Sequence, residues 1–400
     1  MKAFIASFLL LCLTYINLEA KPSHPFPSHQ NYYESISPSA YSQKQLDNNI
    51  KQFYKQWKKD FLVKESSLYR IATDKKNKTK TVSEGQGYGM MIIAYMAGYE
   101  NDAQQIFDGL YLYALKHPSL LHKELMTWRI PEKKGDNDSA FDGDADIAFA
   151  LLLAHRQWGS HGKINYKKEA LKRIKAIMTY TIGKKSYLPL LGDWVDQNGK
   201  KYNQYTTRSS DFMLSHFRVF YLFSHDIRWI KTINSCQNAL KSIQNLPYNK
   251  SRLISDFLYY DKKKKSYFPT HKNFLEAQDD SYYYNACRVP WRIGIDALMY
   301  HNKNSRQIVQ KMLYGIYKIT KANPMMIKSG YKLDGSVIGN YNSTAFIAPF
   351  CIAAKTTQSM QTYLDKLYEL IYNKHENYYE DSINLLSQLI IAEDYWEPIP

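Results

Sequence analysis

The sequence predicts an all-α protein whose helical hairpins form a ring. Segments with helical periodicity dominate the chain, whereas strand signals are short and isolated. The segment 146–158 is apolar nearly all round and predicts a buried helix, while 165–182 has a lysine-rich face and predicts a helix at the surface. Buried helices that alternate with amphipathic ones fit a closed ring. They fit a helical solenoid equally, although no fixed-period repeat is visible.

The N-terminal residues predict a targeting segment followed by a loose connection. In residues 1–20, Lys2 precedes an apolar run that is too short for a membrane span, and small Ala20 closes the segment, as in a secretory signal. A buried N-terminal helix is the alternative. The Pro-rich, polar stretch 21–40 predicts a flexible arm. No linker interrupts the remainder, so 41–400 predicts one domain.

Within this domain the helices are expected in the following order. The first is predicted over 43–63, where apolar residues form one stripe (Leu46, Ile50, Phe53, Trp57 and Phe61). A second begins at Ser83. After the helices at 146–158 and 165–182, the pattern predicts seven more at about 209–224, 226–243, 291–301, 304–321, 342–354, 358–373 and 380–393.

Composition narrows the class of protein. The net charge is +16, but the lysines are spread along the chain, which is typical of a solvated surface. Nucleic-acid binding through these lysines is a weaker hypothesis, because no recognition motif accompanies them. Once the signal is removed, three cysteines remain, too few for a disulfide framework (Cys236, Cys287 and Cys351). The 35 tyrosines and 7 tryptophans suit the apolar faces and polar edges of sugar rings.

The stretch "SEGQGYGM", residues 83–90, places a carboxylate at the start of an apolar helix. Ser83 suits the N-cap position and Gln86 predicts a capping box, which puts Glu84 in the first turn. One interpretation is a carboxylate that only complements the helix dipole. However, each of the three glycines lowers helix stability by about 0.5–1 kcal/mol, and a cap needs none of them. We therefore expect them to leave space for a bulky ligand over Glu84.

Five aspartates crowd into residues 136–146, directly before the apolar helix. An EF-hand calcium loop is excluded, because with Asp138 as first ligand the third position is Ala140 and the twelfth is Phe149. Helix capping would need only one aspartate. Three of them straddle the predicted helix start (Asp142, Asp144 and Asp146). Paired carboxylates there suit the binding of sugar hydroxyls and the tuning of a neighbouring acid.

A third stretch, 272–300, combines acidic and aromatic residues. Its acidic residues lie in a predicted loop (Glu276, Asp279 and Asp280), followed by three tyrosines and then by Asn285 and Arg288. An aromatic loop that merely packs on the core is the alternative interpretation. Together with the two preceding stretches, however, this one completes a recognisable set.

The three stretches resemble those of glycoside hydrolase family 8, a family of inverting endo-glycosidases. The similarity extends over residues 41–395 through the motifs "LMTWRIP", "GDWVD", "RSSDFMLSHFRVF" and "YNACRVPWR". The resemblance implies a single-domain (α/α)6 barrel of six inner and six outer helices. It also implies that Glu84 is the proton donor and that Asp142 contacts the central sugar. A helix N-terminus lowers a carboxyl pKa, so burial or a second carboxylate must raise the pKa of Glu84.

One position departs from part of the family. In one branch, the residue after the tyrosine in "YNACR" is the aspartate that serves as general base; here it is Asn285. The sequence resembles the branch in which a loop glutamate replaces that base. Glu276 is then the expected base, with Asp279 and Asp280 as reserves, and an enzyme without a base is the alternative. The two carboxyls of an inverting pair stand about 6.5–9.5 Å apart, so only a closed fold can bring Glu84 and Glu276 together.

The resemblance implies further residues that bind substrate. Trp128, Trp194 and Tyr284 are expected as stacking platforms. Asn285 is expected to orient the water or a sugar hydroxyl, and Arg288 to bind sugar hydroxyls or hold a carboxylate. Three more substrate-binding positions are expected (Asp144, Asp211 and Tyr379). We expect no cofactor, no metal and no membrane association after signal removal, and a monomer secreted to the periplasm or the cell exterior.

The choice of substrate rests on charge. Family members act on β-1,4-glucans, mixed-linkage β-glucans, xylan or chitosan. Chitosan is polycationic, and a protein of net charge +16 repels it over a Debye length of about 8 Å unless the cleft is acidic. We therefore expect a β-1,4-linked glucan, either cellulose or a mixed-linkage β-glucan. A chitosanase of the same fold and a non-catalytic carbohydrate-binding protein are the alternatives.

Overall fold

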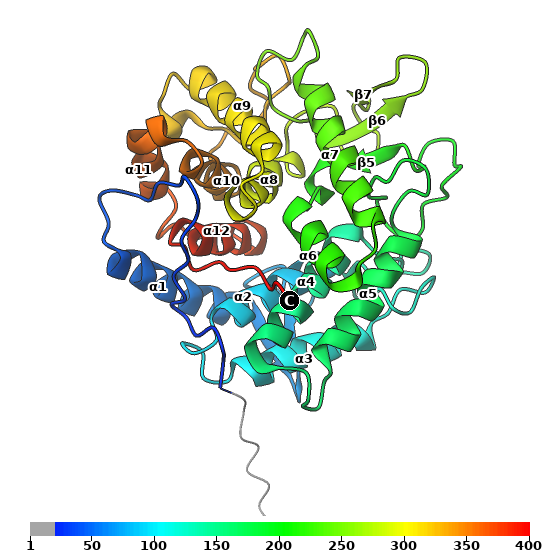
Figure 1. Ribbon diagram of the computed structural model, residues 1–400, viewed down its shortest axis with the longest axis vertical. Helices are drawn as coiled ribbons and strands as arrows, with labels where there is room; N and C mark the ends of the chain where they lie inside the picture. Colours follow the sequence, from blue (N-terminus) through cyan, green and yellow to red (C-terminus); the bar gives the residue numbers. More distant parts are fainter. Residues whose placement is uncertain (1–20) are drawn as a thin grey trace, which may run out of the picture.

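The structure is a computed structural model that describes residues 21–400, and its helices form two layers (Figure 1). Six inner helices carry most of the core: α2 (Ser83–Tyr95), α4 (Phe141–Trp158), α6 (Leu214–Ser224), α8 (Val289–Met299), α10 (Thr344–Lys355) and α12 (Tyr378–Ile391). Each inner helix packs on the next, and α12 closes the ring against α2. Because the ring closes, the (α/α)6 barrel is confirmed and the solenoid is excluded.

Six outer helices surround this ring: α1 (Gln43–Phe61), α3 (Ala103–Lys116), α5 (Tyr166–Tyr180), α7 (Arg228–Gln244), α9 (Lys303–Ile319) and α11 (Gln361–Glu369). They are amphipathic, as α1 illustrates: its predicted apolar stripe is buried and its remaining face is polar. The inner helices α8 and α10 are buried over almost their whole length. The outer helix α3 was not among the predicted helices.

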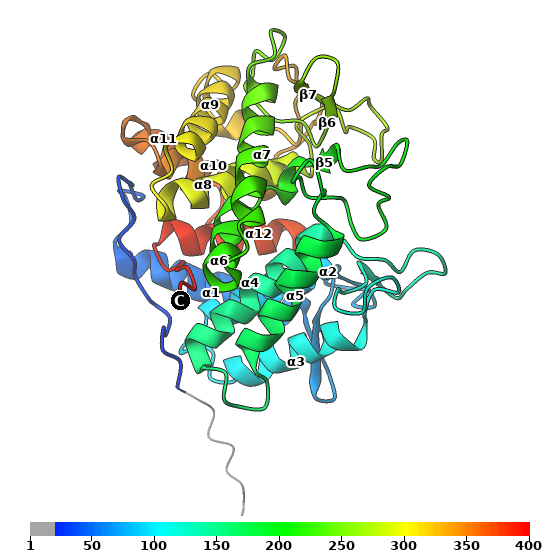
Figure 2. The same ribbon diagram turned by 45° about the vertical axis from the view of Figure 1, so that its right-hand side comes forward.

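Short antiparallel strands and 3-10 turns complete the fold. The strands pair in three groups: β1 (Leu62–Glu65) with β2 (Leu68–Ile71), β3 (Thr81–Val82) with β4 (Arg129–Ile130), and β6 (Phe257–Asp261) with both β5 (Thr206–Arg208) and β7 (Ser266–Pro269). The 3-10 turns are η1 (Ser209–Asp211), η2 (Ala286–Arg288), η3 (Pro324–Met326) and η4 (Gln358–Met360). Figure 2 shows the β5–β6–β7 sheet on one side of the barrel, with the N-terminal arm and the C-terminus on the opposite side.

The expected capping box at the start of α2 is wrong. The N-cap residue is Val82, and the Ser83 hydroxyl is buried without a hydrogen-bond partner among the described residues. The Gln86 side chain instead bonds three backbone groups outside the helix: it accepts from the Ile71 N–H at 3.2 Å and donates to two carbonyls (Tyr69 and Leu110). Gln86 therefore ties α2 to β2 and α3 rather than closing its own first turn.

The glycines of α2 do not leave space for a ligand, which corrects the second expectation for this helix. A Cβ at Gly87 would lie 2.6 Å from Asp146 Cβ on α4, and one at Gly89 would lie 2.4 Å from an Ile71 carbon on β2. Both glycines therefore permit close packing between elements. Only Gly85 lies near the site, where a Cβ would meet the Tyr378 ring at 3.3 Å.

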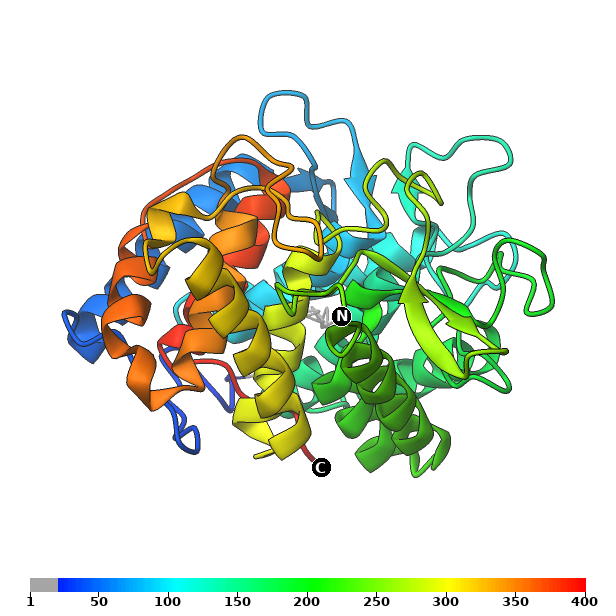
Figure 3. The same ribbon diagram turned by 90° about the horizontal axis from the view of Figure 1, so that it is seen from above.

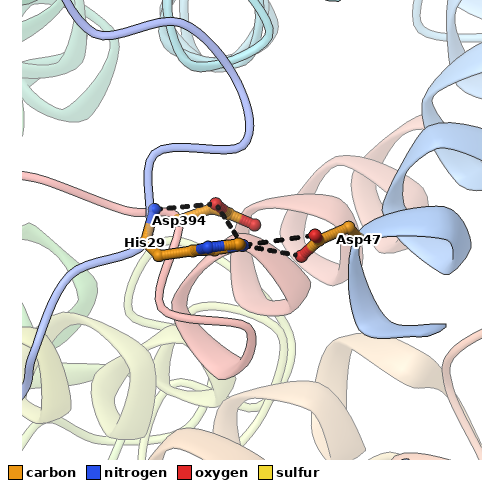
Figure 4. A group of neighbouring side chains, drawn as sticks. All are labelled: His29, Asp47 and Asp394. Carbon is orange, nitrogen blue, oxygen red and sulfur yellow. Dashed lines mark hydrogen bonds and ion pairs between the residues drawn. The ribbon is translucent and has the colours of Figure 1, made fainter. Parts of the chain in front are cut away.

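The arm of residues 21–40 is not loose, contrary to expectation. Its backbone donates hydrogen bonds to the barrel along its length, and Phe26 and Tyr32 are buried in the core. Figure 4 shows His29 between Asp47 of α1 and Asp394, which follows α12. The arm's backbone partners are at or just after the C-terminal ends of α2, α4, α10 and α12, so the arm lies at that end of the inner helices.

Two further observations concern the cysteines and the membrane. The three cysteines outside residues 1–20 are free and buried (Cys236, Cys287 and Cys351). Among the described residues, no helix combines the length and apolarity needed to cross a bilayer. The predicted signal, residues 1–20, lies outside the described part of the chain.

Candidate active site

Chain segments at the N-terminal ends of inner helices surround a hollow of about 410 Å³. Glu84 comes from α2, Asp142 from α4, and Tyr378 and Tyr379 from α12, while η2 brings Arg288. The remaining lining includes Trp128, Arg208, Glu276, Tyr284 and Asn285. The barrel thus brings together four acidic residues, at positions 84, 142, 276 and 380, although they are far apart in sequence.

Glu84 is held by a donor on each carboxylate oxygen. Tyr378 donates its hydroxyl to Oε1 at 2.8 Å, and Arg288 Nη1 donates to Oε2 at 2.7 Å. Burial raises the pKa of Glu84, Arg288 opposes this increase, and the negative charge of Asp142 adds to it. Burial and the charge of Asp142 together prevail over the two arginines and the hydrogen bond from Tyr378, which suits a general acid.

Asp142 is ionised beside Glu84. Burial alone would raise its pKa, but the guanidinium groups of Arg208 and Arg288 outweigh burial and hold the pKa well below its usual range. Arg288 Nη1 donates to Asp142 Oδ2 at 2.8 Å, and Arg208 lies 3.2 Å from Oδ1. Arg288 therefore holds two carboxylates, Glu84 and Asp142, which is the second of its two expected roles.

Asp211 lies behind Arg208 rather than in the hollow. Its carboxylate accepts from Arg208 Nε at 3.0 Å, and its side chain is fully buried. Burial raises the pKa of Asp211 to about 6. The structure therefore does not support Asp211 as a substrate-binding residue: it orients Arg208, which in turn contacts Asp142.

Asp144 and Trp194 also lie outside the hollow. Asp144 is fully buried, accepts from the Met126 N–H at 2.9 Å and pairs with Arg173 of α5, so it points away from the site. Trp194 is half-buried and packs edge-on against Tyr202 at 5.2 Å. Successive residues of a helix point in different directions, so Asp142 and Asp144 cannot both face the hollow.

Glu276 reaches the hollow from the loop after β7. Its side chain is exposed, and its Oε2 accepts a hydrogen bond from Asn285 Nδ2 at 3.2 Å. The Asn285 oxygen accepts from Arg288 Nη2 at 3.2 Å. Asn285 thus connects Glu276 to the arginine that holds Glu84.

The two reserve aspartates do not line the hollow. Asp279 is buried, and its Oδ2 accepts from the backbone N–H groups of Leu275 at 2.6 Å and Glu276 at 2.8 Å. Asp280 accepts from the Ser281 hydroxyl at 2.9 Å. Asp279 therefore shapes the turn that presents Glu276, and Glu276 remains the candidate base.

The aromatic residues of the hollow are fixed in place. Trp128 donates its indole N–H to Asp136 at 2.8 Å, and Arg129 stacks over the Trp128 ring. Tyr379 donates its hydroxyl to the Tyr284 carbonyl, and the two rings lie 6.1 Å apart. All three rings line the hollow, where flat apolar faces with polar edges suit sugar rings.

The sequence did not reveal Asp256, which fixes the backbone of residues 283–286, where Asn285 lies. It is buried and accepts from the N–H groups of Tyr283 at 2.8 Å, Asn285 at 3.1 Å and Ala286 at 2.7 Å, and from Asn285 Nδ2 at 3.2 Å. Burial raises its pKa to about 7. No local pattern marks an aspartate before a short strand, so only the fold reveals this role. Arg208 was missed for the same reason.

A closed helical barrel whose aromatic-lined hollow presents a half-buried carboxyl and an exposed one is typical of a glycoside hydrolase. The family model for glycosyl hydrolases family 8 matches residues 25–393, and the chain belongs to this family.

Similar proteins cover almost all of the chain. An endoglucanase of Bacillus sp. (strain KSM-330) is 40% identical over 99% of this chain and 87% of its own. A beta-glucanase of Niallia circulans is 36% identical over 97% of this chain and 96% of its own. The apo structure of a beta-1,3-1,4-glucanase from Paenibacillus sp. X4 has a TM-score of 0.90 at 37% identity, covering 94% of this chain and 100% of that one.

Proposed function

We propose that the protein is a secreted endo-acting hydrolase of β-linked glucan, cellulose or mixed-linkage β-glucan, that inverts the anomeric configuration. One observation carries the proposal: Glu84, half-buried and with a raised pKa, and Glu276, exposed, line the same hollow. The names of the relatives, endoglucanase, beta-glucanase and beta-1,3-1,4-glucanase, support this substrate class.

In the proposed reaction, Glu84 donates its proton to the oxygen of the leaving sugar. Tyr378 and Arg288 fix the Glu84 carboxyl, and a glucan lying over it would bury it further and keep it protonated. The ionised Asp142 would accept a hydrogen bond from a sugar hydroxyl. It would also stabilise the positive charge that develops on the sugar ring as the bond breaks.

Glu276 acts from the other side of the sugar as general base. Its exposed carboxylate takes a proton from a water molecule, which attacks the anomeric carbon while the bond to the leaving oxygen breaks. Asn285 donates to Glu276 Oε2, which leaves Oε1 of Glu276 for the water. This chain would then follow the branch of the family in which asparagine replaces the usual aspartate base.

The test has two parts. Release of reducing sugar from carboxymethyl-cellulose, lichenan, xylan and chitosan, measured in parallel, should be fastest for one of the two β-glucans. NMR of the first product should show the α-anomer, as inversion of a β-linkage requires. If chitosan is the best substrate, the proposed substrate class is wrong. If the first product is the β-anomer, the inverting mechanism is wrong. Binding without hydrolysis would indicate a non-catalytic protein.

A further inference from the structure

A second hollow, of about 930 Å³, lies outside the active site, beside the β5–β6–β7 sheet. Its walls are the loop around residues 197–203, the turn between β6 and β7, and the start of the loop that carries Glu276. Figure 3 shows the sheet, in yellow-green, at the edge of the helical ring. We refer to this hollow, lined by Lys200, Lys201, Lys262, Lys263 and neighbouring tyrosines, as the lysine groove.

The lysine groove carries unneutralised positive charge. Four lysines line it, and none of them forms an ion pair within the described part of the chain. Its single acidic residue, Asp261, accepts from the backbone N–H groups of Lys263 at 2.8 Å and Lys264 at 3.1 Å, which holds the turn. Uncompensated lysines around a concave surface attract an anionic ligand.

The lysine groove also contains aromatic surface. Tyr205 and Tyr260 are half-buried and stack with ring centroids 6.0 Å apart, and Phe274 forms another part of the wall. Lys262 lies over the Tyr205 ring at 4.4 Å, so charge and ring surface adjoin. Thr270, 5% exposed, adds a hydroxyl with no hydrogen-bond partner among the described residues. A ligand with apolar ring faces, hydroxyls and negative charges would match all three features.

The lysine groove is connected to the active site through one loop. Phe274, in its wall, is two residues from Glu276, and its carbonyl accepts the Tyr202 hydroxyl at 3.1 Å. Tyr202 in turn packs against Trp194. The strand β5, whose start lines the lysine groove, ends at Arg208 in the active-site hollow. A polymer held in the lysine groove would therefore lie next to the loop of the base.

We propose that the lysine groove binds an acidic polysaccharide, with pyranose rings on Tyr205 and Tyr260 and carboxylates on the lysines. This ligand is distinct from the neutral glucan of the active site. The site would hold the enzyme on an anionic matrix while the barrel cleaves neutral glucan chains. The proposal rests on the groove's own charge and rings, and therefore stands or falls independently of the catalytic assignment.

Binding of polygalacturonate, measured by isothermal titration calorimetry, tests the charge requirement. The double variant Lys200→Ala/Lys263→Ala should weaken binding roughly tenfold, because two of four cationic contacts are lost. The matched control is Lys172→Ala/Lys175→Ala, which removes the same charge from exposed lysines of α5. Equal weakening by both double variants, or none by the first, would overturn the proposal.

A second comparison separates a saccharide site from a general anion patch. Tyr260→Ala should weaken polygalacturonate several-fold and leave inorganic polyphosphate unchanged, since only the saccharide uses the ring. Thermal melting checks that this variant is folded; if it is not, Tyr260→Leu, which removes only the aromatic face, takes its place. If polyphosphate binds as tightly as polygalacturonate, the lysine groove is not specific for a saccharide and the proposal is wrong. Tighter binding of a single-stranded oligodeoxynucleotide, weakened by the same variants, would reassign the lysine groove to nucleic acid.

Discussion

Glu84 and Glu276 differ in their surroundings more than in their chemistry. Glu84 is half-buried and fixed by two donors, whereas Glu276 is exposed and receives one hydrogen bond, from Asn285. Two carboxyls with different environments can divide the roles of acid and base at a single pH. The assignment of roles follows from burial, and it leads to two predictions.

Glu84→Gln should lower kcat about 10²–10⁴-fold on any glucan that the protein cleaves, because the leaving oxygen loses its proton source. The raised pKa of Glu84 sets the sign of the pH dependence. The acid works only when protonated, so kcat/KM of the wild type should fall as pH rises through that raised pKa. Residual activity of the variant should lack this alkaline limb. A limb that persists unchanged in Glu84→Gln would assign the proton donor to another group.

Glu276→Gln should abolish hydrolysis nearly as completely while leaving KM within a few-fold, since the amide still reaches the hollow but cannot take a proton. Asp280→Asn is the matched control from the same loop, because its carboxylate bonds Ser281 and not the hollow. That control should retain near-normal kcat. If the two variants behave in the opposite way, Asp280 is the base and the loop changes shape on binding substrate.

Those site residues that belong to short motifs could be predicted from the sequence. Glu84, Asp142, Asn285 and Arg288 all lie in such motifs, and all line one hollow. Spacing along a helix could not show that Asp144 turns toward Arg173, because that partner lies on another helix. Asp256 is likewise defined only by the backbone groups that converge on it in the folded chain.

At the scale of the element, contacts between helices and strands explain why α2 begins with glycines, which helix propensity alone could not explain. Gly87 lies against Asp146 of α4, itself paired with Arg292 and His216 in the barrel interior. Local propensity treats each helical glycine as a loss of stability, but here its missing side chain allows two helices to meet. The helical periods predicted most of the helices in their order along the chain, whereas contacts between elements are invisible to a local pattern.

Two alanine substitutions in α2 separate packing from chemistry. Gly87→Ala should lower the free energy of unfolding by about 1–3 kcal/mol, because its Cβ would lie 2.6 Å from Asp146 Cβ on a rigid neighbour. The Cβ of Gly85→Ala would be tight only against the Tyr378 ring, at 3.3 Å, with Ile71 at an ordinary contact distance of 3.7 Å, and the variant gains helix propensity. Its stability should change little, but kcat should fall because Tyr378 holds Glu84. Urea unfolding and steady-state kinetics measure the two effects. Equal losses of stability would contradict the distinction.

At the scale of the whole molecule, the arm connects residues at the ends of several inner helices. Lys355, buried on α10, donates to the Ile36 carbonyl at 3.0 Å, to the Ser37 hydroxyl at 2.9 Å and to Glu393 at 2.8 Å. The arm's composition suggested flexibility because the residues that it bonds lie elsewhere along the chain, from Ala97 and Gln157 to Lys355 and Glu393. Composition alone cannot show such contacts.

The arm contact at Asp394 should make stability depend on pH. Burial, reinforced by the charge of Asp47, raises the pKa of Asp394 to about 7, whereas an unfolded aspartate titrates near 3.9. Between these values the folded protein holds a proton that the unfolded chain releases. The proton bound to folded Asp394 therefore stabilises the protein fully at low pH, and this contribution to the free energy of unfolding is lost as pH rises toward 7.

Asp394→Asn cannot ionise, but it keeps an oxygen to accept hydrogen bonds from the backbone N–H groups of Ser28 and His29, which Asp394 Oδ1 accepts at 2.8 and 3.3 Å. Figure 4 shows the contact with His29. Urea unfolding should therefore give a flatter decline between about pH 4 and 7 for the variant than for wild type. The variant should be relatively more stable at pH 8, by about 1–3 kcal/mol. Parallel curves for the two proteins would show that Asp394 is ionised throughout and that His29 alone balances its charge.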